Sequence, residues 1–144
     1  MNATRVEIAP GLPDPPLFAA WRRREGWGGI TEAQAYLALA GSQFGALARV
    51  DGAIIGFGRV VGDGALNFYV QDLIVDPDWR GRGVGARLLD ALVERIEGAA
   101  GPGATIALFA AEGREGFYEA RGFRRRPSPG YGPAMMRLLT GARH

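Results

Sequence analysis

The apolar residues of this chain follow two different spacings, and both meet between Val70 and Ile96. Apolar residues from Leu73 to Val75 close a stretch with the pattern of a β-strand. After a short polar stretch, apolar residues recur three and four positions apart, as on one face of an amphipathic helix; they are Leu88, Leu89, Leu92, Val93 and Ile96. The pattern therefore predicts a strand and a helix joined by a loop.

The loop between this strand and this helix is rich in glycine. After an Asp76-Pro77 turn it consists of Arg80, Gly81, Arg82, Gly83, Val84 and Gly85. The first N–H groups of a helix have no partner within the helix, and the helix dipole adds partial positive charge there. Glycines allow an anion to approach the main chain closely. The stretch therefore predicts a site for a phosphorylated cofactor at the start of the helix.

The rest of the pattern predicts a mixed sheet with helices. Asp14 is placed to cap a helix, the pair Thr31 and Gln34 fits a capping box, and Asp51-Gly52 is typical of a two-residue hairpin turn. Strands are expected at 4–8, 44–50, 53–61, 65–75, 105–110, 123–126 and 134–139, and helices from Pro15 to Arg24, from Thr31 to Gly41 and from Arg114 to Arg121.

This order of elements predicts an α/β (α+β) fold that is not doubly wound. The early strands follow one another directly and are expected to be antiparallel, whereas 105–110 follows a helix and is expected to lie parallel to the strand that ends at Val75. A dinucleotide-binding fold is excluded, because the glycine-rich loop follows an antiparallel meander and no acidic residue ends a second parallel strand about 20 residues later. One domain is expected over residues 1–144.

Composition narrows the chemistry that the chain can perform. The sequence has no cysteine and no lysine, and its only histidine is the last residue, His144. Disulfides, a cysteine nucleophile, Schiff-base chemistry and the usual Cys/His zinc sites are thus excluded, and no metal site is expected. Acid–base chemistry would have to come from Asp, Glu, Tyr or water.

Charge and hydropathy narrow the class of partner. The net charge is only +2, so a nucleic-acid partner is not expected. No apolar run is long enough to span a membrane and the N-terminus lacks the pattern of a signal peptide, so no membrane partner is expected and a cytoplasmic location is the default.

Two motifs resemble the GNAT superfamily of acyl-CoA-dependent N-acyltransferases. The loop from Arg80 to Gly85 is similar to the pyrophosphate signature of that family, Gln/Arg-x-x-Gly-x-Gly/Ala, and it follows a strand and a "VDP" sequence as it does there. The segment from Phe117 to Phe123, FYEARGF, looks like the FYEKLGF segment of the family. The resemblance covers roughly residues 4–140, and the motifs are dense only over 70–123.

The resemblance implies a fold and a set of residues that bind the co-substrate acetyl-CoA. In the family, the strand ending at Val75 and the strand at 105–110 would splay apart, and the pantetheine arm would lie between them as an added strand along Leu73, Ile74 and Val75. The pyrophosphate would rest on the amides of Arg82, Gly83, Val84 and Gly85, with side-chain charge from Arg80 and Arg82.

The implied reaction is direct attack of an amine on the acetyl thioester in a ternary complex. Backbone amides at Ile74 or Val75 would polarise the thioester carbonyl, and Tyr118 would protonate the leaving thiolate. The general base stays open between Asp72, Glu25 and an ordered water. Asp72 could equally be a structural carboxylate, and the Glu that several family members carry further back on this strand is replaced by Asn67, Phe68 and Tyr69.

The acceptor is expected to be a primary amine of a small molecule. Trp27 lies in a glycine-rich break where the acceptor site of the family usually forms, and Tyr131 lies in a Pro/Gly loop that could cover the same site. An aromatic, weakly charged pocket would suit a small aralkyl or alkyl amine. Two alternatives are a CoA-binding regulatory module without turnover and an acetyltransferase acting on a protein or peptide amine. Family members often dimerise, so a homodimer is possible.

Overall fold

The computed structural model describes residues 5–139 as two compact units. The first unit ends at Leu108 and the second starts at Phe109. Thr4, the first residue of the expected edge strand, and His144 lie outside the described residues. The single domain expected over 1–144 stays a prediction.

The first unit contains all of the strands that the structure describes. They are β1 (Glu7–Pro10), β2 (Phe44–Val50), β3 (Ala53–Gly62), β4 (Asn67–Val75) and β5 (Thr105–Ala107). Its helices are α1 (Pro15–Arg24), α2 (Glu32–Ala40), the 3-10 helix η1 (Pro77–Trp79) and α3 (Val84–Ala99). The sheet order is β1-β2-β3-β4-β5, antiparallel up to β4, with β5 parallel to β4, which confirms the expected mixed sheet.

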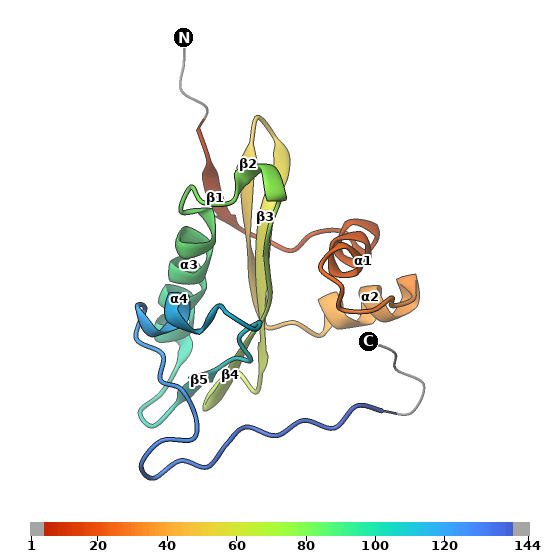
Figure 1. Ribbon diagram of the computed structural model, residues 1–144. Coiled ribbons are helices and arrows are strands. Elements are labelled where there is room, and N and C mark those ends of the chain that lie inside the picture. Colours follow the sequence, from red (N-terminus) through yellow and green to blue (C-terminus); the bar gives the residue numbers. More distant parts are fainter. Residues whose placement is uncertain (1–4, 140–144) are drawn as a thin grey trace. The chain divides into compact units, whose positions relative to one another are not determined.

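Helices cover both faces of this sheet (Figure 1). On one face, α1 and α2 pack over a core cluster of buried residues, namely Phe18, Ala19, Trp21, Ala35, Leu39, Leu47, Phe57 and Ile74. On the other face, α3 buries four of the five residues predicted from its spacing, Leu88, Leu89, Leu92 and Ile96, together with Val84, whereas Val93 is only half-buried. The apolar periodicity therefore identified correctly which helix face meets the sheet.

Two glycines of β3 allow α3 to lie close to the sheet. A Cβ added at Gly56 would stand 3.0 Å from Leu88 Cδ1, and one at Gly58 would stand 3.0 Å from Leu92 Cδ1. Both distances are tighter than ordinary van der Waals contact. Glycine within a strand commonly marks such a close approach, so these two positions set the spacing between α3 and β3.

Local signals in the sequence are confirmed at the element boundaries. Asp14 caps α1 by accepting a hydrogen bond from Leu17 N–H at 2.9 Å. Thr31 and Gln34 form the reciprocal capping box of α2, with distances of 2.9 and 3.0 Å. Asp51 and Gly52 both have positive φ, +49° and +83°, as a two-residue hairpin turn of this type requires.

The second unit contains one short helix, α4 (Glu115–Glu119). The strands expected at 123–126 and 134–139 are wrong: among residues 109–139 the structure shows only an isolated bridge between Ser128 and Tyr131. Where the first of these strands was expected, the side chains make local contacts instead. Arg125 pairs with Glu119, and two arginines lie over the Tyr131 ring. The strand expected at 105–110 is shorter and ends at Ala107.

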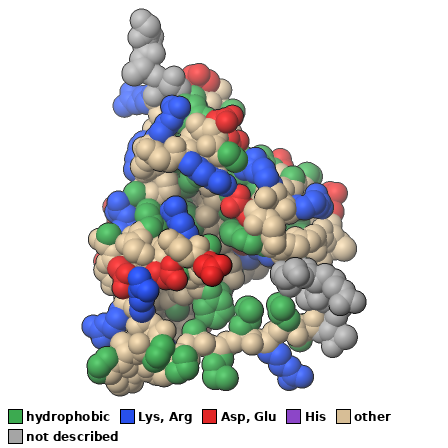
Figure 2. All heavy atoms as spheres, in the orientation of Figure 1, with side chains coloured by type: hydrophobic (Ala, Val, Ile, Leu, Met, Phe, Trp, Pro, Cys, Tyr) green, Lys and Arg blue, Asp and Glu red, His purple; other side chains and the backbone are tan. Residues whose placement is uncertain are grey.

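The segment 134–139 is an apolar run interrupted only by Arg137, and it has no ladder partner in the described part of the chain. Its large apolar side chains are exposed, Met135 by 86% and Leu139 by 79%. Figure 2 shows hydrophobic side chains standing out along this segment. The pattern of apolar residues indicates only that a segment can be extended. A strand also needs a neighbouring strand to pair with its backbone N–H and C=O groups.

Two further expectations concern membranes and metals. Among residues 5–139, no helix is long and apolar enough to cross a membrane. The same described residues contain no group of three or more His, Cys, Asp or Glu side chains arranged to hold a metal ion.

Candidate functional site

The N-terminus of α3 is an open site for an anion. Gly83 is its N-cap residue, with φ +80°, and no side chain caps the helix. The first turn carries no acidic residue. The first N–H groups of this 16-residue helix therefore keep their partial positive charge for a ligand.

Two glycines of the preceding loop leave room for that ligand. Gly81 and Gly83 have φ of +76° and +80°, a region that favours glycine, and a Cβ added at either would meet nothing within 4 Å. Arg82 extends beside them, with its guanidinium 4.7 Å from the centre of the Trp79 ring. The loop predicted to bind pyrophosphate thus combines open space, backbone donors and positive charge, and its residues fit a CoA pyrophosphate.

Arg80 is held against the end of β4. Its Nε donates to the Val75 carbonyl at 3.1 Å, and its Nη2 pairs with Glu25 Oε2 at 2.7 Å. Because Glu25 is the C-cap of α1, this arginine joins the first helix to the strand end. The expected role of Arg80 toward the pyrophosphate stays a prediction, and in the described structure its side chain orders the strand end.

One edge of β4 has no β5 partner over the second half of the strand. The parallel ladder pairs Asn67, Phe68 and Tyr69 with Thr105, Ile106 and Ala107, and goes no further. The edge of β4 beyond Tyr69 therefore has no partner in β5. Two strands that splay apart, as expected for β4 and the strand at 105–110, would leave such an edge. An extended group could add to this edge by main-chain hydrogen bonds.

The alternation of the antiparallel ladder identifies which groups point toward that edge. Asp76 N–H donates to Ile55 O at 2.8 Å, and Val75 and Ile74 lie opposite Gly56 and Phe57. Residues on an antiparallel strand alternate between bonding the neighbour and pointing away from it. Ile74 therefore bonds β3, whereas Val75 directs its N–H away from β3, so of the two expected oxyanion donors the geometry favours Val75.

Asp72 lies at a bulge of β4 and is buried. Its φ is +54°, and β4 places two residues, Asp72 and Leu73, opposite the single residue Gly58. The side chain has no exposed surface. Its Oδ1 pairs with Arg22 Nη1 and its Oδ2 with Arg59 Nε at 2.7 Å. Both oxygens thus face guanidinium groups, as expected for the structural alternative; the role of general base stays untested.

The two arginines were not identified from the sequence as site residues. Arg59 also donates from Nη1 to Ala38 O at 3.3 Å and to Ser42 Oγ at 3.2 Å. Arg22 comes from the run of three arginines that ends α1, which reads as a solvated helix end, yet its side chain is only 21% exposed. The sequence did contain an indication of a buried ion pair, because Arg59 is the one charged residue in the otherwise uncharged stretch of β3, and a buried charge needs a partner.

Tyr118 lies in the second unit, on α4. Its ring packs edge-on against Phe117 and Phe123, at centroid distances of 5.0 and 5.9 Å. Burial raises the pKa of the Tyr118 phenol above its ordinary value of 10, and the nearby charge of Arg114 opposes this shift in part. The phenol therefore stays protonated at neutral pH, as a general acid must be; its catalytic role stays a prediction.

The two expected substrate-binding aromatics belong to different units. Trp27 lies between α1 and α2, partly buried against the core cluster, with the Arg22 guanidinium 5.6 Å from its ring centre. Tyr131 is 52% exposed, and Arg124 and Arg126 lie 5.9 and 5.5 Å from its ring centre. The structure thus places Trp27 in contact with an arginine that binds Asp72, and their roles toward a substrate stay predictions.

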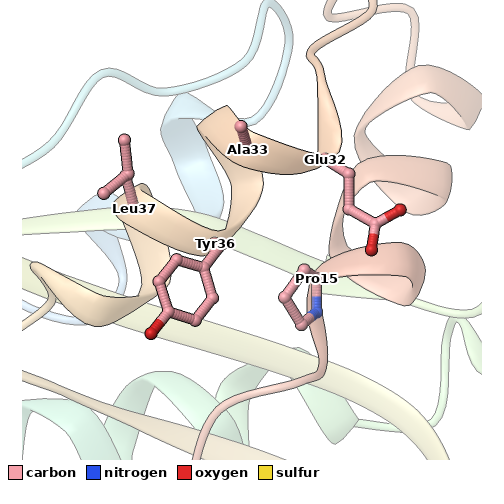
Figure 3. Close-up of a pocket in the computed structure, with 5 residues that line it drawn as sticks. All are labelled: Pro15, Glu32, Ala33, Tyr36 and Leu37. Carbon is pink, nitrogen blue, oxygen red and sulfur yellow. The ribbon is translucent and has the colours of Figure 1, made fainter.

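A hollow of about 540 Å³ opens on the surface of α1 and α2 (Figure 3). It is lined by Pro15, Glu32, Ala33, Tyr36 and Leu37, and the Tyr36 ring faces Pro15. None of the residues expected to bind the co-substrate or the acceptor lines it. The first unit therefore contains the glycine-rich loop, the open edge of β4 and the Asp72 cluster, which consists of Asp72, Arg22 and Arg59. The hollow is lined by none of these residues.

Comparisons with known proteins agree with this geometry. The sequence family described as "Acetyltransferase (GNAT) domain" matches residues 42–125. Serotonin N-acetyltransferase 2, chloroplastic, from Oryza sativa subsp. japonica is 35% identical over 86 residues, which cover 60% of this chain and 42% of that protein. The chain therefore spans less than half the length of this relative.

Solved structures share the fold at lower identity. A GNAT family acetyltransferase from Streptococcus pneumoniae superposes with a TM-score of 0.78 at 24% identity, covering 94% of this chain and 99% of that one. A GNAT family N-acetyltransferase from Escherichia coli in complex with CoA gives a TM-score of 0.63 at 23% identity, covering 86% and 71%. With its mixed sheet and its glycine-rich loop at the start of α3, the chain belongs to the GNAT family of N-acetyltransferases.

Proposed function

We propose that this chain transfers an acetyl group from acetyl-CoA to the primary amine of a small molecule by direct attack in a ternary complex. The observation that carries the proposal is the uncapped N-terminus of α3, which opens beside the free edge of β4 in the same unit. One element suits a pyrophosphate and the other suits the amide groups of a pantetheine arm.

The residues of the chain would divide the binding of acetyl-CoA between them. The amides from Arg82 to Gly85 would hold the pyrophosphate, and Gly81 and Gly83 would allow it to come close to the backbone. The groups along Leu73 to Val75 that point away from β3 would bind the pantetheine arm. When bound, acetyl-CoA supplies an activated acetyl group as a thioester.

Two groups of the chain would act on the reacting atoms. The Val75 N–H would donate to the thioester oxygen as negative charge develops on it. Tyr118 would donate its proton to the leaving sulfur; a phenol is protonated at neutral pH, and burial raises its pKa further. For the base that deprotonates the ammonium, an ordered water or Glu25 suits the geometry better than Asp72, whose side chain is enclosed.

The acceptor class is inferred from aromatic residues and from one relative. Trp27 offers an aromatic surface beside a charged cluster. The rice relative is named for serotonin, an aralkyl amine, and the likeness covers 60% of this chain. Both support a small aralkyl amine over a polyamine or a peptide.

Binding and turnover are tested in two steps. Acetyl-CoA is expected to raise the thermal unfolding midpoint of the protein, since a ligand that binds only the folded state stabilises it. Thiol release from acetyl-CoA is then followed over serotonin, a simple alkyl amine, spermidine and a lysine-containing peptide. Serotonin is expected to give the highest kcat/KM.

Each alternative gives a different result in this assay. Binding without thiol release for any amine would favour a CoA-binding regulatory module, and turnover with the peptide alone would favour a protein acetyltransferase. An unchanged unfolding midpoint at saturating acetyl-CoA would contradict the proposal as a whole. The cytoplasmic location and the homodimer expected from the sequence stay predictions, and gel filtration of the same preparation measures the second.

A further inference from the structure

The bulge at Asp72 decides which residues of β4 point toward its open edge. On one side of the bulge Gln71 lies opposite Arg59, and on the other side Ile74 lies opposite Phe57. Without the additional residue, Leu73 would take the place opposite Phe57, and every later residue would move by one. Because strand residues alternate, a shift of one residue exchanges the groups that bond β3 with those that point away.

The side chains after the bulge show what this shift would exchange. Ile74 is buried in the core cluster under α1 and α2, whereas Leu73 lies on the opposite face, where its Cδ1 would be 3.0 Å from a Cβ added at Gly58. A shifted register would direct the Ile74 N–H to the open edge in place of the Val75 N–H. The backbone donor proposed for the thioester thus depends on the bulge.

The conformation of the bulge is specified by Asp72. Its φ of +54° lies in the left-handed region, which Asp and Asn tolerate better than other residues with a side chain. The carboxylate is tied to three elements at once: to α1 through Arg22, to β3 through Arg59, and through Arg59 to the last turn of α2 at Ala38 O. A buried carboxylate held on both oxygens has little freedom to rotate, so the bulge cannot move along the strand without breaking these pairs.

We propose that Asp72, held by Arg22 and Arg59, is a positioning residue that sets the register of the thioester-binding end of β4. The inference rests on the proposed function, since it assigns Asp72 a role in the same acetyl transfer. Asp72 acts through the backbone of Leu73 to Val75 and does not touch the reacting atoms. Through Arg22 the cluster also connects this strand end to α1, whose C-cap is Glu25 and which precedes Trp27, and through Arg59 it connects the strand end to α2.

Two substitutions at Asp72 separate the register from the charge. Asp72→Asn removes the charge but keeps a residue that tolerates the left-handed region, whereas Asp72→Ala removes both. We expect kcat of Asp72→Ala to fall about 100-fold, as for a misplaced reacting group, and that of Asp72→Asn to stay within about tenfold of the parent with an unchanged pH profile, which loss of a base would not allow. Activity is referred to the folded fraction measured by circular dichroism.

A matched control is available at Asp51. It is the other residue with a side chain that has positive φ in the described chain, at +49°, and it lies in the β2–β3 turn. Asp51→Ala introduces the same backbone strain away from the site and is expected to leave kcat and the KM for acetyl-CoA unchanged. Equal losses in Asp72→Asn and Asp72→Ala, with the acidic limb of the pH profile removed, would make Asp72 the base and overturn the proposal.

A second pair of variants keeps the test valid if Asp72→Ala does not fold. Arg22→Gln removes one partner of Asp72, and Arg23→Gln makes the same change of charge at the next, exposed position of α1. We expect kcat to fall about tenfold in Arg22→Gln, consistent with partial loss of the register, and to be unchanged in Arg23→Gln. Equal kcat in these two variants would contradict a role for the cluster in positioning.

Failure of the proposed function would be recognised separately. If the parent protein binds acetyl-CoA but releases no thiol with any amine, the same variants are compared by calorimetric titration with acetyl-CoA. The inference then predicts that Asp72→Ala binds acetyl-CoA about tenfold more weakly than Asp51→Ala does, because the edge of β4 proposed to bind the pantetheine arm is out of register. Equal affinity of the two variants would overturn it.

Discussion

The two units of this chain hold their residues in place by different means. In the first unit, five strands and three α-helices bury two apolar layers, and even a carboxylate with two arginine partners is enclosed. In the second unit, residues 109–139 rely on one helix of five residues, on ring contacts and on an ion pair between the exposed side chains of Glu119 and Arg125. Packing against distant segments thus specifies the first unit, and short-range contacts specify the second.

The contrast shows that the residues that hold the backbone in place and the residues proposed to take part in the reaction need not be the same. The proposed binding surface for acetyl-CoA is built on the buried unit, where its geometry is fixed by the sheet and by α3. The proposed acid, Tyr118, is held by the thinner unit, through two aromatic neighbours within five residues of it. Four experiments test how far this contrast extends.

The largest effect is expected on folding stability from Leu92→Ala. Leu92 is 1% exposed on α3 and contacts the sheet at Gly58, so truncation is expected to cost about 3 kcal/mol of unfolding free energy. Leu139→Ala, in the exposed segment of the second unit, is expected to cost less than about 0.5 kcal/mol. Urea unfolding measures both, and a loss at Leu139 as large as that at Leu92 would remove the contrast between the units.

The next effect is expected on turnover from Tyr118→Phe. Loss of a general acid is expected to lower kcat about 100-fold with little change in the Kd for acetyl-CoA. Because burial raises the pKa of the phenol above 10, the parent protein should keep its acid form, and this contribution to kcat, up to at least that pH. Tyr36→Phe, at an exposed position of α2, serves as control. Equal kcat of Tyr118→Phe and the parent at every pH would exclude Tyr118 as the acid.

A smaller effect is expected on acetyl-CoA affinity from Gly83→Ala. The substitution strains a backbone at φ +80° and adds a methyl group where the pyrophosphate is expected to approach, so we expect about a tenfold increase in Kd. Gly52→Ala is a matched control with φ +83° and equally open surroundings in the β2–β3 turn. Both variants should lose similar stability, and a similar loss of affinity in both would mean that strain alone is responsible.

The smallest effect concerns the pH dependence of stability at Asp63. Its Oδ1 accepts hydrogen bonds from the N–H groups of Ala65, Leu66 and Asn67, which hold the pKa of this carboxyl well below its usual range. Since the folded pKa is depressed, this stabilisation is present above pH about 4 and is lost as the pH falls below it. Asp63→Asn should flatten the stability curve between pH 4 and 2 in urea unfolding, and an unchanged slope would contradict the assignment.

Much of the first unit could be predicted from the sequence because its signals are local. The capping pair Thr31 and Gln34, the Asp51-Gly52 turn and the apolar face of α3 all act within a few residues, and all are confirmed. The glycine-rich loop was found in the same way. Its two left-handed glycines and its place before a helix are properties of a short stretch of chain.

The parts that were missed depend on partners far away in the sequence. Arg22 is 50 residues from Asp72, and Arg59 is 13 residues from it, so no local pattern joins them. The same limit explains the wrong strand at 134–139, whose apolar composition says nothing about whether a neighbouring strand is present. A buried ion pair and the pairing of two strands both depend on tertiary structure, so they cannot be predicted from the residue pattern of one segment.

The two glycines of β3 under α3 have a consequence for anyone who redesigns this protein. A methyl group at Gly56 or Gly58 would stand 3.0 Å from Leu88 Cδ1 or Leu92 Cδ1, so these side chains of α3, or the helix that carries them, would have to give way. Where the helix itself gives way, the proposed anchor for the pyrophosphate moves relative to the edge of β4 without any change in a residue that is proposed to meet acetyl-CoA. A mutational library limited to the ligand-facing residues would miss positions that control the distance between the two halves of the site.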